Sequence, residues 1–171
     1  MTRFSFYTVD SAYCDYLRTF DPCVPYTIAH KSTRPFIGIV LNVGDVQYYA
    51  PLTSPKPKHL TMKNQVDFLK INGGVYGAIN FNNMIPIHSN SLSLVDMTVY
   101  PTDNAPDIQY KNLLANQLSW CNANRELLFK KAETLYKRYI DGTLGDTVKS
   151  RCCNFSLDEI KLREYVASKT W

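Results

Sequence analysis

Residues 36–52 read FIGIVLNVGDVQYYAPL, and this stretch decides the fold class. Its first part, residues 36–41, is a continuous apolar run of strand length, as expected of a buried strand. Gly44 and Asp45 are residue types that tight turns use, and residues 46–52 are largely apolar again. The stretch therefore predicts an antiparallel hairpin inside a β-sheet.

Residues 48–59 read YYAPLTSPKPKH. In this stretch the second arm of the hairpin runs into a short segment from Thr53 to His59, which we call the corner. Pro55 and Pro57 each fix φ and lack a backbone N–H, so the corner neither continues the sheet nor becomes a helix interior. The hydroxyl and lysine side chains beside these prolines are therefore presented by a stiff segment.

The N-terminal half of the chain reads as β-structure with one helical interruption. Asp10 or Ser11 is suited to cap a short helix that ends before Asp21 and Pro22. Residues 21–35 contain several prolines and scattered polar groups, which is typical of a loop. Further strands are expected, in addition to the hairpin, at residues 4–9, 66–71, 78–87 and 92–95.

The composition becomes helical after Pro106. Apolar residues recur at helical spacing over residues 107–140, and Asn122 or Asn124 offers a break, so one bent helix and two helices are both compatible. Ser156 with Glu159 matches a capping box and predicts a last helix to about residue 168. The expected architecture is α+β: a small curved β-core followed by a helical C-terminal third.

The length of 171 residues indicates one domain, residues 1–171. No apolar run is long enough for a membrane span, and the N-terminus lacks the pattern of a secretory signal. The five cysteines are odd in number and lack C-x-x-C spacing, which favours reduced thiols and a cytoplasmic protein. The three histidines share no ligand spacing with them, so a zinc site is not expected. A net charge of +4 suits a polyanionic partner without requiring one.

Hydroxyls beside cations are the chemistry that the sequence offers. The ends of a hairpin are neighbours, so Lys31 and Arg34 before its first strand should meet Thr53, Ser54 and Lys56 after its second. Such a cluster suits a phosphate, and the 2′-OH of RNA supplies a built-in nucleophile for cleavage without a metal. The alternatives are a solvated turn, an RNA-binding module without catalysis, or, less favoured, an enzyme with a small phosphorylated substrate.

Five segments in register carry a family resemblance: Phe6-Tyr7-Thr8 with Tyr13 and Tyr16-Leu17; F-I-G-I-V-L from residue 36; A-P-L-T-S-P-K at 50–56; N-x-x-x-M-I-P-I at 80–87; and C-N-F-S-L at 153–157. Together they resemble the ToxN/AbiQ family of type III toxin–antitoxin and abortive-infection endoribonucleases. The resemblance covers nearly the whole chain.

The resemblance implies a compact, strongly curved antiparallel β-barrel-like core, similar to the Kid/MazF toxins, with added helices. It implies metal-independent, sequence-specific RNA cleavage by 2′-OH attack that leaves a 2′,3′-cyclic phosphate, with no cofactor. The implied partners are cellular or phage RNA substrates and an RNA antitoxin of pseudoknot repeats, which closes with the toxin into a cyclic assembly.

The family's active-site positions fall on Thr53, Ser54, Lys56 and the helix tyrosine Tyr13; packing against the sheet is an equal alternative for Tyr13. The family's loop lysine falls on Arg34, and its loop tyrosine on His30. Arginine keeps the charge but hardly accepts a proton, so Lys31 is the alternative for the lysine role. His30 would add a group that titrates near neutrality.

Basic residues outside this cluster are candidates for RNA binding, with a merely solvated face of amphipathic helices as the alternative. These candidates, together with Lys31, are Lys58, Lys111, Arg125, Lys130, Lys131, Lys149 and Arg151. His59 is expected to be a solvated loop residue, and Cys152 with Cys153 a packed, reduced pair.

Overall fold

The centre of the fold is the expected hairpin, made of β2 (Phe36–Val43) and β3 (Val46–Thr53). We analysed a computed structural model of the protein, which describes residues 2–27 and 34–171. The two strands pair antiparallel, with Phe36 opposite Pro51 and Val43 opposite Val46 across the turn. Both strands are largely buried, as the apolar run predicts.

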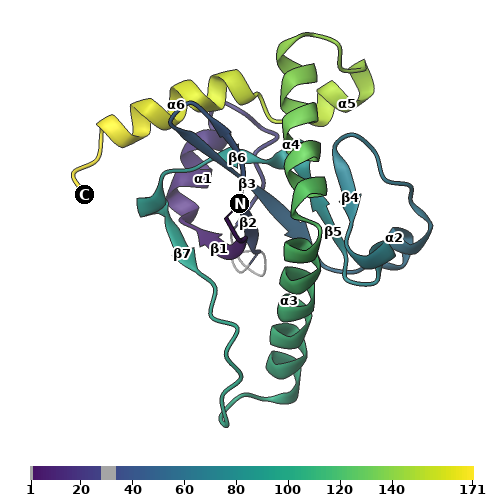
Figure 1. The fold of residues 1–171 in the computed structure, drawn as a ribbon. Helices are drawn as coiled ribbons and strands as arrows, with labels where there is room; N and C mark the ends of the chain where they lie inside the picture. Colours follow the sequence, from purple (N-terminus) through teal and green to yellow (C-terminus); the bar gives the residue numbers. More distant parts are fainter. Residues whose placement is uncertain (1, 28–33) are drawn as a thin grey trace.

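The other strands extend the sheet on both sides of the hairpin (Figure 1). They are β1 (Ser5–Val9), β4 (Phe68–Lys70), β5 (Ala78–Asn80), β6 (Ile85–Pro86) and β7 (Leu92–Leu94). The strand order is β4-β5-β3-β2-β1-β7, and β6 also pairs with β3. In the described parts of the chain no ladder joins β4 to β7, so the sheet is open and the expected barrel-like core is not a closed barrel. Both edge strands are only three residues long, which leaves little backbone for closure.

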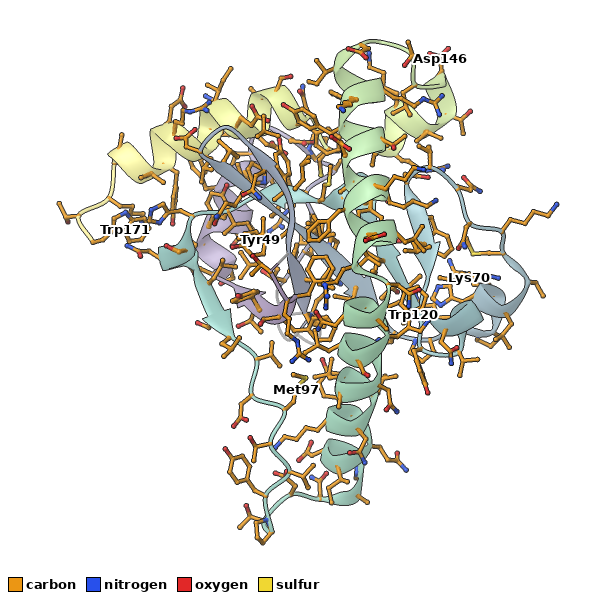
Figure 2. All side chains as sticks on the ribbon, in the orientation of Figure 1. Tyr49, Lys70, Met97, Trp120, Asp146 and Trp171 are labelled. Carbon is orange, nitrogen blue, oxygen red and sulfur yellow. The ribbon has the colours of Figure 1, made fainter. Side chains whose placement is uncertain are left out.

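The hairpin is irregular at its middle. The register of β2 against β3 shifts between Gly38 and Leu41, and such bulges bend a strand and increase its twist. Gly38 allows the Tyr49 side chain to lie directly against the backbone, because a Cβ at this position would come within 2.0 Å of the Tyr49 ring (Figure 2). The curvature expected of the core thus has a local cause in these residues.

The predicted helices are present with corrected boundaries. Helix α1 (Ser11–Arg18) begins after Asp10, whose side chain accepts from the Ala12 N–H. Helices α3 (Ala105–Ala123) and α4 (Arg125–Ile140) are separate and meet at Asn124, which decides between the two alternatives.

The last helix, α6 (Phe155–Ala167), begins earlier than the capping-box pattern predicted. Its N-cap is Asn154, whose side chain accepts from the Leu157 N–H at 3.2 Å, so Ser156 lies within the first turn. Both residues have N-cap side chains, and the sequence alone does not rank them. Two short helices, α2 (Pro57–Thr61) and α5 (Asp146–Arg151), were not predicted.

The helical third covers the sheet and closes the core (Figure 1). Helix α4 packs on β2 through buried Leu128, Ala132 and Leu135. Helix α6 lies against β6 and α1, and its chain end brings Trp171 onto the His88 ring, with centroids 5.4 Å apart (Figure 2). The first half of α3 extends beyond the sheet (Figure 1). Residues of this helix line a hollow together with residues of the corner after β3. None of the described helices combines the length and apolarity needed to cross a bilayer.

Candidate active site

The two ends of the central hairpin meet as predicted. Beyond the last paired residues, the Leu52 N–H donates to the Pro35 carbonyl at 3.0 Å. This bond continues the antiparallel ladder and holds Arg34 beside Thr53 at the end of β3. The geometric inference drawn from the sequence is therefore confirmed for the described part of the loop.

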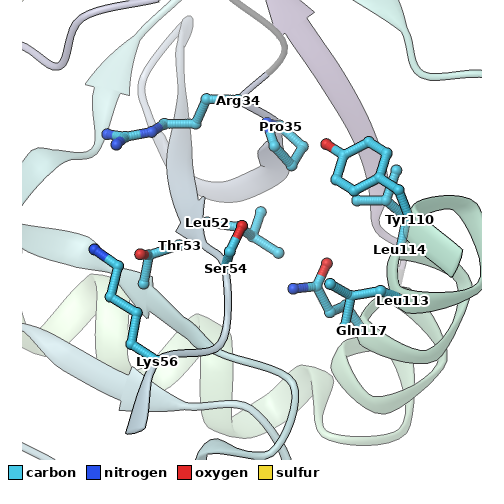
Figure 3. A pocket seen from close by; sticks show the side chains of 10 residues that line it. All are labelled: Arg34, Pro35, Leu52, Thr53, Ser54, Lys56, Tyr110, Leu113, Leu114 and Gln117. Carbon is cyan, nitrogen blue, oxygen red and sulfur yellow. The ribbon is translucent and has the colours of Figure 1, made fainter. Parts of the chain in front are cut away.

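A hollow of about 400 Å³ opens at this junction, between the corner and α3 (Figure 3). The hairpin and corner contribute Arg34, Pro35, Leu52, Thr53, Ser54 and Lys56 to its lining, and α3 contributes Tyr110, Leu113, Leu114 and Gln117. Figure 3 shows the hydroxyls of Thr53 and Ser54 on the same side of the hollow as the Arg34 and Lys56 side chains. Four of the six predicted catalytic residues therefore line one space.

A second hollow of about 350 Å³ adjoins the first, because Arg34, Thr53 and Lys56 line both. It runs from these residues towards α2, β4 and the end of α5, where Lys58 and Arg151 contribute to its lining. The cation and hydroxyl cluster thus stands at the point where two hollows meet.

The cations at this point have no carboxylate partner in the described structure. Arg34, Lys56 and Lys58 make no ion pair with any described residue. Burial lowers the pKa of the Arg34 guanidinium from its ordinary value. Arg34 is half-buried, whereas Lys56 and Lys58 are exposed. Positive charge that no ion pair compensates is a suitable environment for a phosphate.

The corner is held in place by a residue that the sequence analysis misjudged. His59 is only 2% exposed, so the expectation of a solvated loop residue is wrong. Its Nδ1 accepts from the Lys56 N–H at 3.1 Å, and its backbone N–H donates to the Lys56 carbonyl at 2.9 Å. Burial, together with Lys58 and Lys56, lowers the pKa of His59, which favours the neutral imidazole that can accept this bond.

A glycine that directly precedes the neighbouring strand β5 lets this corner form. Gly77 has a φ of +91°, and a Cβ there would lie 2.1 Å from the Thr53 carbonyl oxygen. The backbone at Thr53 and Ser54 therefore rests directly on Gly77, and any side chain at this position would displace both hydroxyls.

Tyr13 is not brought to the hollow. Its side chain is fully buried, its hydroxyl donates to the Pro86 carbonyl at 2.5 Å, and it lines neither hollow. Burial raises its pKa well above the ordinary value, which leaves the phenol neutral. The alternative that Tyr13 packs against the sheet describes its position, so the substrate-contact role is corrected.

Two further site residues of the sequence analysis, His30 and Lys31, lie outside the described residues. Arg34 is described and stands beside Thr53, so a cation from this loop does reach the hollow.

The candidate RNA-binding residues divide into two groups. Lys58 and Arg151 line the second hollow, and the Lys131 ammonium donates to the Gln65 carbonyl at its edge. Arg151 is tied by an ion pair of 2.6 Å to Asp67, whose side chain is buried, and this pair raises the pKa of the arginine.

The remaining candidates lie away from both hollows. Lys111 is paired with Asp103 at 2.7 Å, Arg125 donates to the Asn122 carbonyl at 3.0 Å, and Lys149 lies over the Tyr139 ring. Lys130 is on α4 and also faces neither hollow. These residues make no contribution to the lining of either hollow.

The α3 wall of the first hollow was not predicted. Tyr110, Leu113, Leu114 and Gln117 follow the i, i+3, i+4, i+7 spacing of one helix face. In a sequence this spacing indicates a core-facing stripe, and only the tertiary structure shows that part of the stripe faces a hollow. The polar residue Gln117 within this stripe was the sequence feature that could have indicated the hollow.

One group of possible metal ligands occurs among the described residues, in the core beneath α6. Ligand atoms of Asp21, Cys153 and Asp158 lie within 4.8 Å of one another, and all three residues are buried. Asp21 accepts from the N–H groups of Cys23 and Asn154 at 3.0 and 2.6 Å, so it holds two segments together. Burial and the neighbouring Asp21 raise the pKa of Asp158 to about 9, so this side chain is a neutral acid at pH 7. The five cysteines are not joined in disulfides, and all except Cys23 are buried.

Comparison with known proteins identifies relatives over nearly the whole chain. Residues 5–163 match the family described as toxin ToxN of type III toxin–antitoxin systems. Endoribonuclease ToxN of Pectobacterium atrosepticum is 37% identical over 168 residues, which are 94% of this chain and 92% of that protein.

Two solved structures are similar in fold as well as in sequence. One, from work on selective toxin inhibition by a non-coding RNA pseudoknot, has a TM-score of 0.78 at 29% identity and covers 96% of this chain and 99% of its own. The other is AbiQ, a lactococcal anti-phage endoribonuclease of a type III system, with a TM-score of 0.81 at 25% identity over 98% of this chain and 100% of that chain.

Proposed function

This chain belongs to the ToxN toxin family of type III toxin–antitoxin systems, and we propose that it is an endoribonuclease toxin that an RNA antitoxin inhibits. The observation that carries the proposal is the meeting of Arg34, Thr53, Ser54 and Lys56 at one hollow. No carboxylate among the described residues compensates these cations, so the site favours an anionic group such as a phosphodiester.

We propose that cleavage uses the 2′-OH of the RNA as its nucleophile. The 2′ oxygen loses its proton and bonds to phosphorus while the bond to the 5′ oxygen breaks; this oxygen takes up a proton, so the products are a 2′,3′-cyclic phosphate and a 5′-hydroxyl end. The nucleophile belongs to the same nucleotide as the scissile phosphate, so the protein has to orient the strand and stabilise the charge that builds on the phosphoryl oxygens. Nothing in this reaction requires a metal ion or another cofactor.

The residues have distinct parts in this reaction. Arg34 and Lys56 place positive charge beside the phosphate, where it stabilises the pentavalent stage. The hydroxyls of Thr53 and Ser54 donate hydrogen bonds to phosphoryl oxygens or orient the 2′-OH. His59 touches no reacting atom; it positions Lys56 through the Nδ1 bond to the Lys56 backbone.

Membership of the same family is the basis for the proposed antitoxin. We propose that repeats of a pseudoknot RNA cover the cation cluster and that toxin and RNA close into a cyclic assembly. The free thiols of all five cysteines support a cytoplasmic location for the toxin. The bulged central hairpin supports a curved core related to that of the Kid/MazF toxins.

The reaction is tested with purified protein on RNA in the presence of a chelator. We expect cleavage to persist with the chelator and to stop when a single 2′-deoxynucleotide replaces the nucleotide before the cut. Cleavage that the chelator abolishes, or that the 2′-deoxy substrate supports, contradicts this chemistry. Binding without cleavage would identify the chain as an RNA-binding module.

The site is tested with Ser54→Ala. Ser54 is exposed at a turn, so its loss costs little stability. We expect the variant to fold and to lose growth inhibition on expression. A soluble Ser54→Ala protein with unchanged toxicity would remove Ser54 from the site.

A further inference from the structure

The wall that α3 contributes to the first hollow contains a buried polar side chain, Gln117. The residue is 2% exposed, and its Nε2 donates to the Tyr76 carbonyl at 2.7 Å. A carbonyl only accepts, so this bond fixes the orientation of the amide: the nitrogen faces Tyr76 and the oxygen faces the other way. Figure 3 shows the amide projecting from α3, with its nitrogen on the side of Ser54 and its oxygen on the side of Tyr110.

The Gln117 oxygen has no hydrogen-bond partner in the described structure. Its Oε1 is one of the few buried side-chain acceptors without a donor. A buried acceptor in this state is costly, and proteins normally satisfy it. An unpaired acceptor that is shut off from water in the wall of a hollow, beside a phosphate-binding cluster, is suited to a donor that a ligand brings when it enters and displaces the groups covering this atom.

The surroundings of Gln117 suit a flat, largely apolar group. Leu52, Leu113 and Leu114 line the hollow around it, and Tyr110, which is 39% exposed, adds an aromatic ring from the same helix. The volume of about 400 Å³ is in the usual range for small-ligand sites, roughly 300–1,000 Å³. Bases of single-stranded RNA are commonly held between apolar and aromatic side chains while their Watson–Crick edges form hydrogen bonds.

We propose that the hollow on the α3 side is a base-selective subsite, in which Gln117 Oε1 accepts a hydrogen bond from the exocyclic amino group of a nucleobase next to the scissile phosphate. The inference rests on the proposed function, because the phosphate must lie on Arg34, Thr53 and Lys56 for the adjoining base to enter this hollow. An amino group offers hydrogens to Oε1, whereas the C4 carbonyl of uracil would face it with lone pairs. The site therefore favours adenine, cytosine or guanine, which carry an exocyclic amino group, over uracil, whose one donor on this edge is the N3–H between two carbonyls.

The test is a double-mutant cycle that combines a substitution at Gln117 with removal of one exocyclic amino group from the RNA. The cut is first mapped on the unmodified protein. At each nucleotide beside the cut the amino group is then removed alone, with purine riboside for adenosine, zebularine for cytidine or inosine for guanosine. We expect removal of the amino group at one of these positions to lower kcat/KM at least about tenfold, because the loss leaves Oε1 unpaired.

In Gln117→Met, which has a similar shape but no acceptor, the same RNA pair should be cleaved at nearly equal rates. General damage to the fold of this variant lowers both rates and leaves their ratio unaffected. The matched control is Leu113→Ala, which alters the same wall without removing the acceptor and should keep the tenfold preference.

Two results would overturn the inference: no flanking position that responds to amino deletion in the unmodified protein, or a preference that persists in Gln117→Met. Both are distinct from failure of the proposed function, which would appear as absence of cleavage of every RNA by the unmodified protein.

Discussion

The cations of the corner and those of the helical third stand in different surroundings. Arg34, Lys56 and Lys58 line hollows and form no ion pair with a described carboxylate; Asp67, which also lines the second hollow, is paired with Arg151. In the helical third, several cations lie against an acid; these pairs are Lys111–Asp103, Lys137–Glu133, Arg151–Asp67 and Lys161–Glu164. We infer that a basic residue indicates a phosphate site only where the fold gives it no ion pair with a carboxylate.

Removal of one cation from each region should give the largest difference in the rate of RNA cleavage. Lys56→Ala should lower the rate of RNA cleavage by about 10²–10³-fold, as for other groups that stabilise charge in a transition state. Lys137→Ala is the matched control, because its ion pair of 3.0 Å with Glu133 is exposed on the helix surface. We expect its cleavage rate to change by less than about twofold. Similar reductions in the two variants would contradict the distinction between the regions.

Arg151 sharpens the comparison, because it belongs to the helical third yet lines the second hollow. Its partner Asp67 is buried, so Arg151→Ala leaves a buried carboxylate without its ion pair. We expect a decrease of about 2–3 kcal/mol in the free energy of unfolding, measured with denaturant. Arg163→Ala, in which the parent side chain lies 3.4 Å from exposed Asp45, should change stability by less than about 0.5 kcal/mol.

A variant Arg151→Ala of unchanged stability that cleaves RNA poorly would identify this arginine as a phosphate ligand and move it into the first group.

The buried acid Asp158 should make the free energy of unfolding depend on pH. Burial and Asp21 raise its pKa in the folded state to about 9, above the ordinary value of 3.8. The folded state therefore holds a proton that the unfolded state releases, and stability falls as pH rises from about 4 to 9. Asp158→Asn removes this dependence, so at pH 8 it should be more stable than the parent by on the order of 1–3 kcal/mol, with the difference shrinking towards pH 4.

Denaturant unfolding of both proteins at pH 5 and pH 8 measures this difference. Because Asp158 lines neither hollow, the cleavage rate of the folded variant should stay close to that of the parent at either pH. A gap in stability that widens towards acid pH would contradict the assignment of a neutral carboxyl.

The smallest expected effect is on the salt dependence of RNA binding. Removing a cation that neutralises one phosphate should lower the slope of log K against log salt concentration by about 1. Lys58→Gln should show this change with the antitoxin RNA, whereas Lys137→Gln should leave the slope unaltered. Equal slopes for both variants and the parent would mean that Lys58 does not bind a phosphate.

Sequence reasoning predicted the hairpin and the convergence at its ends because these depend on local patterning. The run from Phe36 and the turn at Gly44 specify two paired strands, and pairing alone brings Arg34 to Thr53. The pattern could not decide whether the sheet closes, because that depends on how the short strands β4 and β7 lie relative to each other.

The residues whose places the sequence did not settle have their positions set by contacts distant in sequence. His59 follows two prolines and lysines, a context that indicates solvent, but α2 folds back so that its ring lies 5.9 Å from Phe68. Tyr13 is on the predicted helix, and its role was decided by the Pro86 carbonyl, 73 residues away. Gln117 follows a core-like spacing, and only the packing of α3 beside the corner shows that its amide faces a hollow.

The most direct measurement is a crystal structure of the protein with a short RNA that carries a 2′-deoxynucleotide before the cut. We predict that the scissile phosphate lies within about 3.5 Å of Lys56 Nζ or the Arg34 guanidinium and of the Ser54 or Thr53 hydroxyl. A phosphate backbone bound along α4, with both hollows empty of RNA, would contradict the account.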